Sequence, residues 1–416
     1  MPKTANSDKN WSANLMATIK MYNVEFGECI LMSEGNQGLL IDCGTDSGPQ
    51  ALPFSHLISD LNTVSYRQLM ISHFHDDHIN GIHELIKHYP RSFYRIFLPN
   101  IFNTENRFIS LILLREYLQI RTVSFGTTSD IWSLLKKLLL HRYRLTPLHR
   151  GNTFSVVNSN WIVYSPNPRQ ESLKDLFDNA KSRIIKEIER TNNANKEMDL
   201  LSVEDLFNDL KKEGELICQV VNNYIEKYRE IREDSPEYVA QMDGMIREID
   251  KLQVSVLSNL LSKSILGTKV VKNIISYIQK KENENSIVCE AMTHDDKRLL
   301  FTGDITPGKF KKIIPELIDP IRPFYCVKAP HHGTESYFVN LKSLDPQNII
   351  ISNGYSHIPS HAGISNQYRQ IGIAKIICTN GKCAQATRRG AQATRKCAIP
   401  QCPKKDHKCM QGDIIV

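Results

Sequence analysis

Residues 71–81 read ISHFHDDHING, and they place three histidines and two aspartates within six positions, from His73 to His78. The short apolar run before them, 66–72, predicts a buried strand that ends at a polar loop. Such a cluster is costly to bury unless something pairs with it, and a divalent metal is the simplest partner. Imidazole and carboxylate groups suit Zn(II) foremost, and Mn or Fe as well. The spacing is too dense for one tetrahedral ion, so the loop predicts two adjacent metal ions; the alternative is a polar loop without a metal.

The size and composition of the chain favour a protein with a large core. It has 416 residues, 41% of them hydrophobic, which suggests two to three domains. No stretch approaches the roughly 18 consecutive apolar residues of a membrane span. The polar segment 1–14 lacks the apolar region of a secretory signal and predicts a disordered arm. With ten cysteines and no export signal, reduced thiols are favoured over disulfides, and we expect a cytoplasmic protein.

Charge is distributed unevenly along the chain, whose formal net charge is +7. Residues 103–150 contain eight basic and three acidic side chains, and residues 377–416 contain eight basic and two acidic ones. Basic stretches beside a metal centre favour a polyanionic substrate such as nucleic acid. The alternative is ordinary solubilising charge.

The segment 169–284 differs in character from both of its neighbours. It contains almost no proline or glycine, 19 basic and 22 acidic residues, and apolar residues at helical spacing. These features predict three to four helices, and a strand-like pattern precedes the segment and resumes after it. We therefore predict a helical insertion. Its apolar stripes are expected to form a core, and the alternative is a surface that binds a protein partner.

Further strand-like runs also end in polar loops that offer metal ligands. The runs and their loops are 298–302 before Gly303-Asp304, 323–328 before APHHGT at 329–334, and 348–352 before Asn353-Gly354, with His357 and His361 beyond. In layered α/β folds, sites form where strand ends meet, so segments far apart in sequence converge there. The recurrence predicts that these loops join the loop of His73 to His78.

The order HFHDDH, TGD, APHHGT and ISNG with a later histidine resembles the metallo-β-lactamase superfamily. The chain looks most similar to the branch that holds the hydrolase domain of the bacterial DNA-uptake competence protein and the phosphorylcholine esterases. In that branch a segment matched here by 283–287 (NENSI) precedes the GD strand. The resemblance implies an α/β fold, the αββα sandwich, with its first half in 15–168 and its second half in 285–376. The helical insertion 169–284 and a basic, Cys-rich tail, 377–416, lie outside the match.

The resemblance also implies the ligands of two divalent metal ions, Zn(II) foremost and Mn(II) as the alternative. The implied ligands are His73, His75, Asp77, His78, Asp304, His331 and His361. His73 and His75 hold one ion, Asp77 and His78 hold the other, and Asp304 bridges them. We expect His331 to be the ligand of the adjacent pair, with His332 beside it or on the substrate. His361 has the spacing of the last ligand, and His357 is its rival.

One departure from the superfamily pattern concerns the position before the GD strand. Many members carry a histidine there, and this chain has Asn285. One metal position is therefore expected to lack a nitrogen ligand, which makes it weaker or open to Mn(II).

The mechanism implied by the resemblance is hydrolysis by a hydroxide that bridges the two metals. The expected catalytic residues are Asp77, Asp304 and His332, and the candidates for assisting the leaving oxygen are His332, His361 and Lys328. The basic stretches and the branch favour a phosphodiesterase, specifically a DNA nuclease, and an effector that works with a partner protein is an added hypothesis. The alternatives are a hydrolase of a small phosphoester, cyclic nucleotide or acyl ester, and a partner-binding scaffold with a vestigial site.

The tail contains a second candidate metal site. Its possible ligands are Cys378, Cys383, Cys397, Cys402 and Cys409. Four thiolates among them suffice for one structural zinc, although their spacing is loose for a zinc knuckle. The alternative is a set of reduced cysteines in a basic loop.

Overall fold

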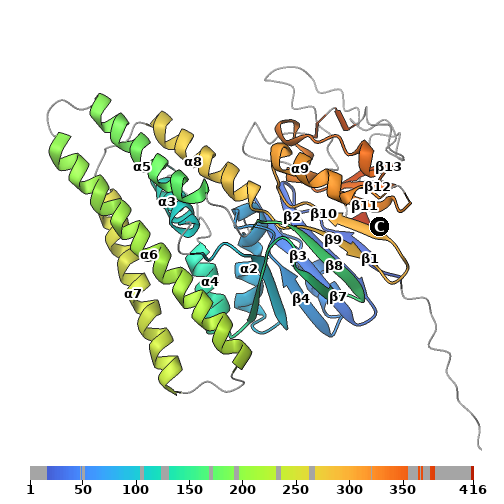
Figure 1. Cartoon of the computed structure of the whole chain (residues 1–416). Coiled ribbons are helices and arrows are strands. Elements are labelled where there is room, and N and C mark those ends of the chain that lie inside the picture. Colours follow the sequence, from blue (N-terminus) through green and yellow to red (C-terminus); the bar gives the residue numbers. More distant parts are fainter. Residues whose placement is uncertain are drawn as a thin grey trace, which may run out of the picture.

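Two mixed β-sheets, face to face, form the centre of the protein (Figure 1). The computed structural model describes residues 16–46, 48, 52–103, 107–122, 131–167, 172–191, 196–230, 236–261, 268–319, 321–354, 364–365, 367–368, 375–379 and 414–416. Each sheet has seven strands within these residues. The expected arm 1–14, His357, His361 and most of the tail lie outside them.

The first sheet has the order β14-β1-β2-β3-β4-β5-β6. It is antiparallel from β14 to β3 and parallel from β3 to β6. Its strands are β1 (Thr18–Met21), β2 (Gly27–Glu34), β3 (Gln37–Thr45), β4 (Tyr66–Met70), β5 (Arg95–Pro99), β6 (Arg144–Leu148) and β14 (Ile414–Ile415).

The second sheet has the order β13-β12-β11-β10-β9-β8-β7 and is antiparallel from β7 to β10 and parallel from β10 to β13. Its strands are β7 (Thr153–Val156), β8 (Ser159–Ser165), β9 (Val288–Met292), β10 (Arg298–Phe301), β11 (Phe324–Lys328), β12 (Asn348–Ile351) and β13 (Lys375–Cys378).

The two sheets pack through a shared apolar layer. Met32 and Met70 of the first sheet and Trp161 and Phe301 of the second belong to one buried cluster. Strands β3 and β12 are buried on both faces and read as near-continuous apolar runs, whereas β8 alternates between buried and exposed residues.

Helices cover the outer faces of both sheets. The helices α1 (Phe54–Leu61), α2 (Asp76–His88) and α4 (Ile131–Leu140) pack on the first sheet, whereas α3 (Phe108–Thr122) packs mainly against the helices of segment 169–284. The helix α9 (Pro307–Leu317) and the short 3₁₀ turns η3 (Pro330–Gly333), η4 (Glu335–Tyr337) and η5 (Lys342–Leu344) lie on the second. This order of layers is the predicted αββα sandwich, and the fold class is confirmed.

Four long helices occupy the segment between β8 and β9 and stand to one side of the sheets (Figure 1). They are α5 (Ser172–Thr191), α6 (Lys196–Glu230), α7 (Pro236–Leu261) and α8 (Thr268–Glu284). The predicted stripe Ile217, Val220 and Val221 is buried in the same cluster as Leu69 of β4. The helical insertion therefore shares one apolar core with the first half of the sandwich. No described helix is long and apolar enough to cross a membrane.

Candidate metal centre

The loop 71–75 joins the end of β4 to the start of α2, and both ends of the loop fix its side chains. His75 is the N-cap of α2, and Asp77 and His78 lie in its first turn. Carboxylates are favoured there because the helix dipole is positive at its N-terminus. A Cβ at Gly44, at the end of β3, would overlap the backbone of Asp77 and His78, so glycine lets strand and helix approach closely.

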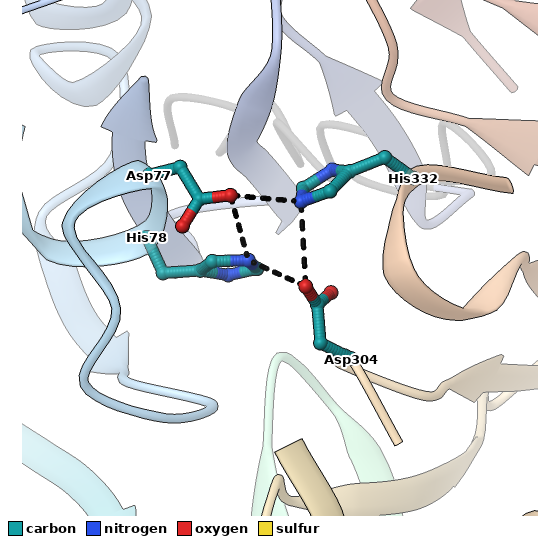
Figure 2. A group of neighbouring side chains, drawn as sticks. All are labelled: Asp77, His78, Asp304 and His332. Carbon is teal, nitrogen blue, oxygen red and sulfur yellow. Dashed lines mark hydrogen bonds and ion pairs between the residues drawn. The ribbon is translucent and has the colours of Figure 1, made fainter. Parts of the chain in front are cut away.

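Four side chains from three distant segments meet at this loop (Figure 2). They are Asp77, His78, Asp304 and His332, and their ligand atoms all lie within 4.8 Å of one another. His332 Nε2 lies 3.2 Å from Asp77 Oδ2 and 3.4 Å from Asp304 Oδ2. His78 Nε2 lies 3.4 Å from the same Asp304 oxygen. The convergence of the HDDH, GD and HHG motifs is thus present in the fold.

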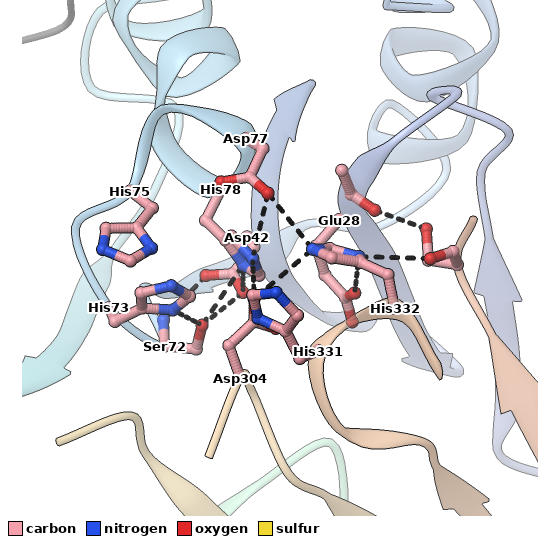
Figure 3. A network of polar contacts seen from close by, with 12 residues as sticks. Glu28, Asp42, Ser72, His73, His75, Asp77, His78, Asp304, His331 and His332 are labelled. Atoms are coloured by element: carbon pink, nitrogen blue, oxygen red, sulfur yellow. Dashed lines mark hydrogen bonds and ion pairs between the residues drawn. The ribbon is translucent and has the colours of Figure 1, made fainter. Parts of the chain in front are cut away.

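The predicted ligands His73, His75 and His331 lie beside this group (Figure 3), and His361 is outside the described residues. The ring centroid of His73 lies 4.1 Å from that of His78 and 4.5 Å from that of His75. His331 Nδ1 lies 2.7 Å from Asp304 Oδ2, and its ring stacks on Tyr337 at 3.7 Å. His332, which we expected to contact a metal ligand or the substrate, belongs to the four-residue group, and His331, the expected ligand, lies next to that group. Which of the two binds metal stays a prediction.

Each histidine of the loop and His332 presents one nitrogen to a protein partner. His73 Nδ1 lies 3.0 Å from Ser72 Oγ, and His78 Nδ1 lies 2.8 Å from Asp42 Oδ2. His332 Nδ1 donates to the carbonyl oxygen of Ser352 at 3.1 Å, and His75 Nε2 lies 2.8 Å from a carboxylate oxygen of Glu282. Partners of this kind are typical of metal-binding histidines, because they fix the ring and leave its other nitrogen for the ion.

The remaining nitrogens of this centre fit a divalent metal. His73 Nε2 and His78 Nε2 are buried and make no hydrogen bond to any described residue, although His78 Nε2 lies near a carboxylate oxygen of Asp304. A buried polar atom without a hydrogen bond is unfavourable, and a metal ion is the partner that neutral imidazole and carboxylate groups accept. The donor set therefore suits divalent metal ions and metal-dependent hydrolytic chemistry.

Burial and neighbouring charge shift the pKa values of this group in opposite directions. Burial disfavours the carboxylate of Asp304, but the surrounding histidines and Lys328 hold its pKa well below the ordinary range. Burial also disfavours a charged His332, yet Asp304 and Asp77 outweigh it and raise its pKa to about 9. The pKa of His73 is well below its usual value because of burial and the neighbouring His78 and His75.

A buried lysine supports Asp304 from the interior. Lys328 Nζ donates to the carbonyl oxygen of Gly303 at 2.9 Å and lies 3.1 Å from Glu28 Oε2 and 3.4 Å from Asp304 Oδ1. Its ammonium is therefore committed to Glu28 and Asp304. Glu28 was not among the residues predicted from the sequence, because a lone glutamate in a strand gives no signal of a lysine far along the chain.

Asn285 is the position at which the resemblance led us to expect a missing nitrogen ligand. Its side-chain nitrogen donates to the carbonyl oxygen of Lys281 at 2.8 Å, so it bonds to the last turn of α8. Of the predicted cysteine ligands, Cys378 lies on β13 and the others are outside the described residues. The tail zinc site stays a prediction.

The chain is similar in part to several known proteins. A family model described as "Anti-Pycsar protein Apyc1" matches residues 17–110, which include the loop of His73 to His78. The comparison with curated protein sequences gave no match.

Solved structures of several metallo-β-lactamase fold proteins are similar to the chain. YhfI from Bacillus subtilis shares 8% identity with a TM-score of 0.36, over 87% of this chain and 96% of that protein. CmlA, a diiron beta-hydroxylase from Streptomyces venezuelae, shares 9% sequence identity with a TM-score of 0.36, and the match covers 86% of this chain and 52% of CmlA. A B3 metallo-β-lactamase with an active-site glutamic acid shares 13% sequence identity with a TM-score of 0.24, and the match covers 36% of this chain and 50% of that enzyme. The chain thus matches about half the length of the last two proteins.

Proposed function

We propose that this protein is a two-metal phosphodiesterase that hydrolyses a small phosphodiester of the size of a cyclic nucleotide. The observation that carries the proposal is the convergence of Asp77, His78, Asp304 and His332 beside His73 and His75. When bound, two divalent ions supply a water of lowered pKa and offset the charge that develops on phosphate oxygens. The carboxylates of Asp77 and Asp304 stay ionised, since their pKa values lie far below neutrality. Both therefore serve as ligands and do not donate protons.

The open side of the centre is where a substrate must enter. The side chains of Asp304, His78 and His332 have no solvent exposure, whereas those of Asp77, His331 and His75 retain 16%, 12% and 11%. The entry side therefore lies along Asp77, His75 and His331.

Polar groups at this side are available to orient a substrate. Asn283 Nδ2 donates to Tyr337 Oη at 3.0 Å, and Tyr337 stacks on His331. The buried Asn283 Oδ1 makes no hydrogen bond to a described residue. We assign Asn283 and Tyr337 to holding the ester group beside His331, whose pKa burial keeps below its usual value, so that a neutral ring faces the leaving oxygen.

Charge pairing favours a small substrate over a polymer. The basic stretch 103–150 raised the expectation of a nucleic-acid surface, but four of its eight basic side chains face carboxylates of neighbouring helices. The pairs are Arg107 with Asp178, Arg115 with Glu282, Lys136 with Asp250 and Arg150 with Glu316. Three of these four acids belong to the helical insertion, so half of the basic side chains of the stretch are paired within the protein, which favours a small substrate.

DNA is the second candidate substrate. The tail 377–416 carries eight basic and two acidic residues, which supports a contact with nucleic acid. The matched family model is described as an anti-Pycsar protein, which supports an action directed against Pycsar. An effector that works with a partner protein is compatible with a small phosphodiester and with DNA as the substrate.

A substrate panel with Mn(II)- and Zn(II)-loaded protein separates these functions. The panel consists of 3′,5′-cyclic nucleotides, bis(p-nitrophenyl) phosphate, p-nitrophenyl acetate, single-stranded DNA and plasmid DNA. We expect cyclic nucleotides to be hydrolysed and DNA to be left intact. The Asp304→Asn variant should lose more than the roughly 100-fold that removing a partner of a metal ligand costs. Asp319→Asn, in an exposed turn, is the matched control.

The outcomes of the panel are distinct. DNA cleavage that vanishes in Asp304→Asn would establish the nuclease, and turnover of the acetate alone would establish an acyl esterase. Hydrolysis that survives in Asp304→Asn would refute the proposed centre.

A further inference from the structure

Glu282 places a buried carboxylate of the helical insertion beside the loop of His73 to His78, called the metal loop below. It lies in the last turn of α8, and its side chain is only 2% exposed. Its Oε2 lies 2.8 Å from His75 Nε2 and 3.0 Å from Arg115 Nε on α3. Three segments therefore meet at one oxygen atom: the metal loop, the outer helical layer and the end of the insertion.

The charges around this oxygen show why Glu282 can be buried. An unpaired carboxylate is strongly disfavoured inside a protein, and the equally buried guanidinium of Arg115 offsets it. The remaining contact of Oε2 is with His75. Because Nε2 of His75 is occupied by Glu282, Nδ1 is the nitrogen left for a metal.

His75 differs from the other histidines of the centre in the origin of its partner. The partners of His73, His78 and His332 are Ser72, Asp42 and Ser352, all in the sandwich itself. His75 depends on a residue 207 positions away, on the insertion.

We propose that Glu282 is a positioning residue for the metal position of His73 and His75, and that the helical insertion is thereby a part of the metal site. The proposal rests on the two-metal site proposed above. Glu282 accepts a hydrogen bond from His75 Nε2, which holds the ring with Nδ1 toward the ion. Arg115 keeps the carboxylate in place.

Metal titration of the full-length apoprotein tests this role without any substrate. Zn(II) and Co(II) stoichiometry and affinity are measured by competition with a chelator. Wild type should bind two equivalents. Glu282→Ala should bind the second equivalent 10–100-fold more weakly, the usual effect of removing the partner of a ligand histidine. Glu282→Gln should recover most of the affinity, because both contacts use Oε2 and an amide oxygen can take its place.

Two matched controls separate positioning from a general loss of structure. Glu284→Ala removes a carboxylate two residues further along α8, which pairs with Lys281 at 2.8 Å, and should leave both equivalents unchanged. Imidazole ¹⁵N spectra of the apoprotein should show His75 protonated at Nε2 in wild type and Glu282→Gln, and a tautomer mixture in Glu282→Ala.

The following results would overturn the proposal: two equivalents of wild-type affinity in Glu282→Ala, an equal loss in Glu284→Ala, or no recovery in Glu282→Gln. Since the titration contains no substrate, failure to hydrolyse phosphodiesters would refute the proposed function and leave this result standing.

Discussion

The two sides of the metal centre are built in different ways. Around Asp304, the supporting groups Lys328, Glu28 and Asp42 come from strands of the sandwich and are almost fully buried. Around His75, the support comes from α8 and α3, outside the sheets. The side of Asp304 is thus formed by the sandwich alone, whereas the side of His75 also requires that the helical insertion packs against the sandwich.

The two sides also differ in electrostatics. His78 and His332 face carboxylates, which outweigh burial and raise their pKa values. His73 faces other histidines, and burial together with these neighbours lowers its pKa. Without metal, the side of Asp304 therefore holds protons that a metal must displace, and His73 is ready to bind.

The largest expected effect distinguishes the two adjacent histidines. His332→Ala removes a member of the four-residue group and should leave one metal equivalent, with activity reduced more than about 100-fold. His331→Ala should retain both metals and lower kcat, because His331 lies at the entry side. Metal analysis with steady-state kinetics checks both. Loss of metal in His331→Ala alone would restore the ligand assignment expected from the sequence.

A smaller effect concerns the protons released on metal binding. At pH 7 the raised pKa of His332, about 9, means that the ring is protonated and must lose its proton to bind a metal. Affinity at the side of Asp304 should therefore rise about tenfold per pH unit for each proton displaced, until the pH passes about 9. His73, whose pKa lies well below its usual value, should itself release no proton.

Calorimetric titration in buffers of different ionisation enthalpy measures these protons directly. Equal proton release by the two equivalents would contradict the difference between the sides.

The smallest effect uses a buried histidine, His83, whose pKa is shifted by burial and by a lysine. His83 lies on α2, like His78, but contacts Lys137 Nζ at 3.0 Å, and burial together with this lysine lowers its pKa to about 4. The unfolded chain takes up a proton below about pH 6.5 and the folded protein does not. Stability should therefore fall by up to about 1.4 kcal/mol per pH unit as the pH drops from 6.5 to 4.

Denaturant unfolding of His83→Gln between pH 4 and 7 tests this slope. The variant lacks the proton that His83 takes up on unfolding, so its stability should depend less steeply on pH. His88→Gln, an exposed neighbour on the same helix, is the control. An unchanged slope in His83→Gln would exclude this cause.

The metal loop and its partner motifs were predictable because their information is local. HFHDDH follows a strand in the sequence, GD and HHG do the same, and parallel strand ends meet at one edge. The helices of 169–284 were likewise predictable from the spacing of apolar residues, which are buried in a core shared with β4.

Glu282 and Lys328 were not predictable as parts of the support. A glutamate among the many charges of a helix has the pattern of a solvated side chain, and its partners Arg115 and His75 lie far away in sequence. The same limit affects charge counting: the basic stretch 103–150 has a net excess, but Arg107 and Lys136 meet acids of the insertion. The sequence shows which residues are charged, but only the folded structure shows which of them form ion pairs.

The distance between His75 and Glu282 along the chain has a consequence for biosynthesis. Ribosomes add about 5–20 residues per second, so the 207 residues that separate the two take about 10–40 s to make. During this interval the nascent loop has its histidines but neither its carboxylate partner nor Asp304 and His332. The ligands and the carboxylate support of the proposed two-metal site are therefore complete only after the fourth helix of the insertion, Asp304 and His332 have left the ribosome.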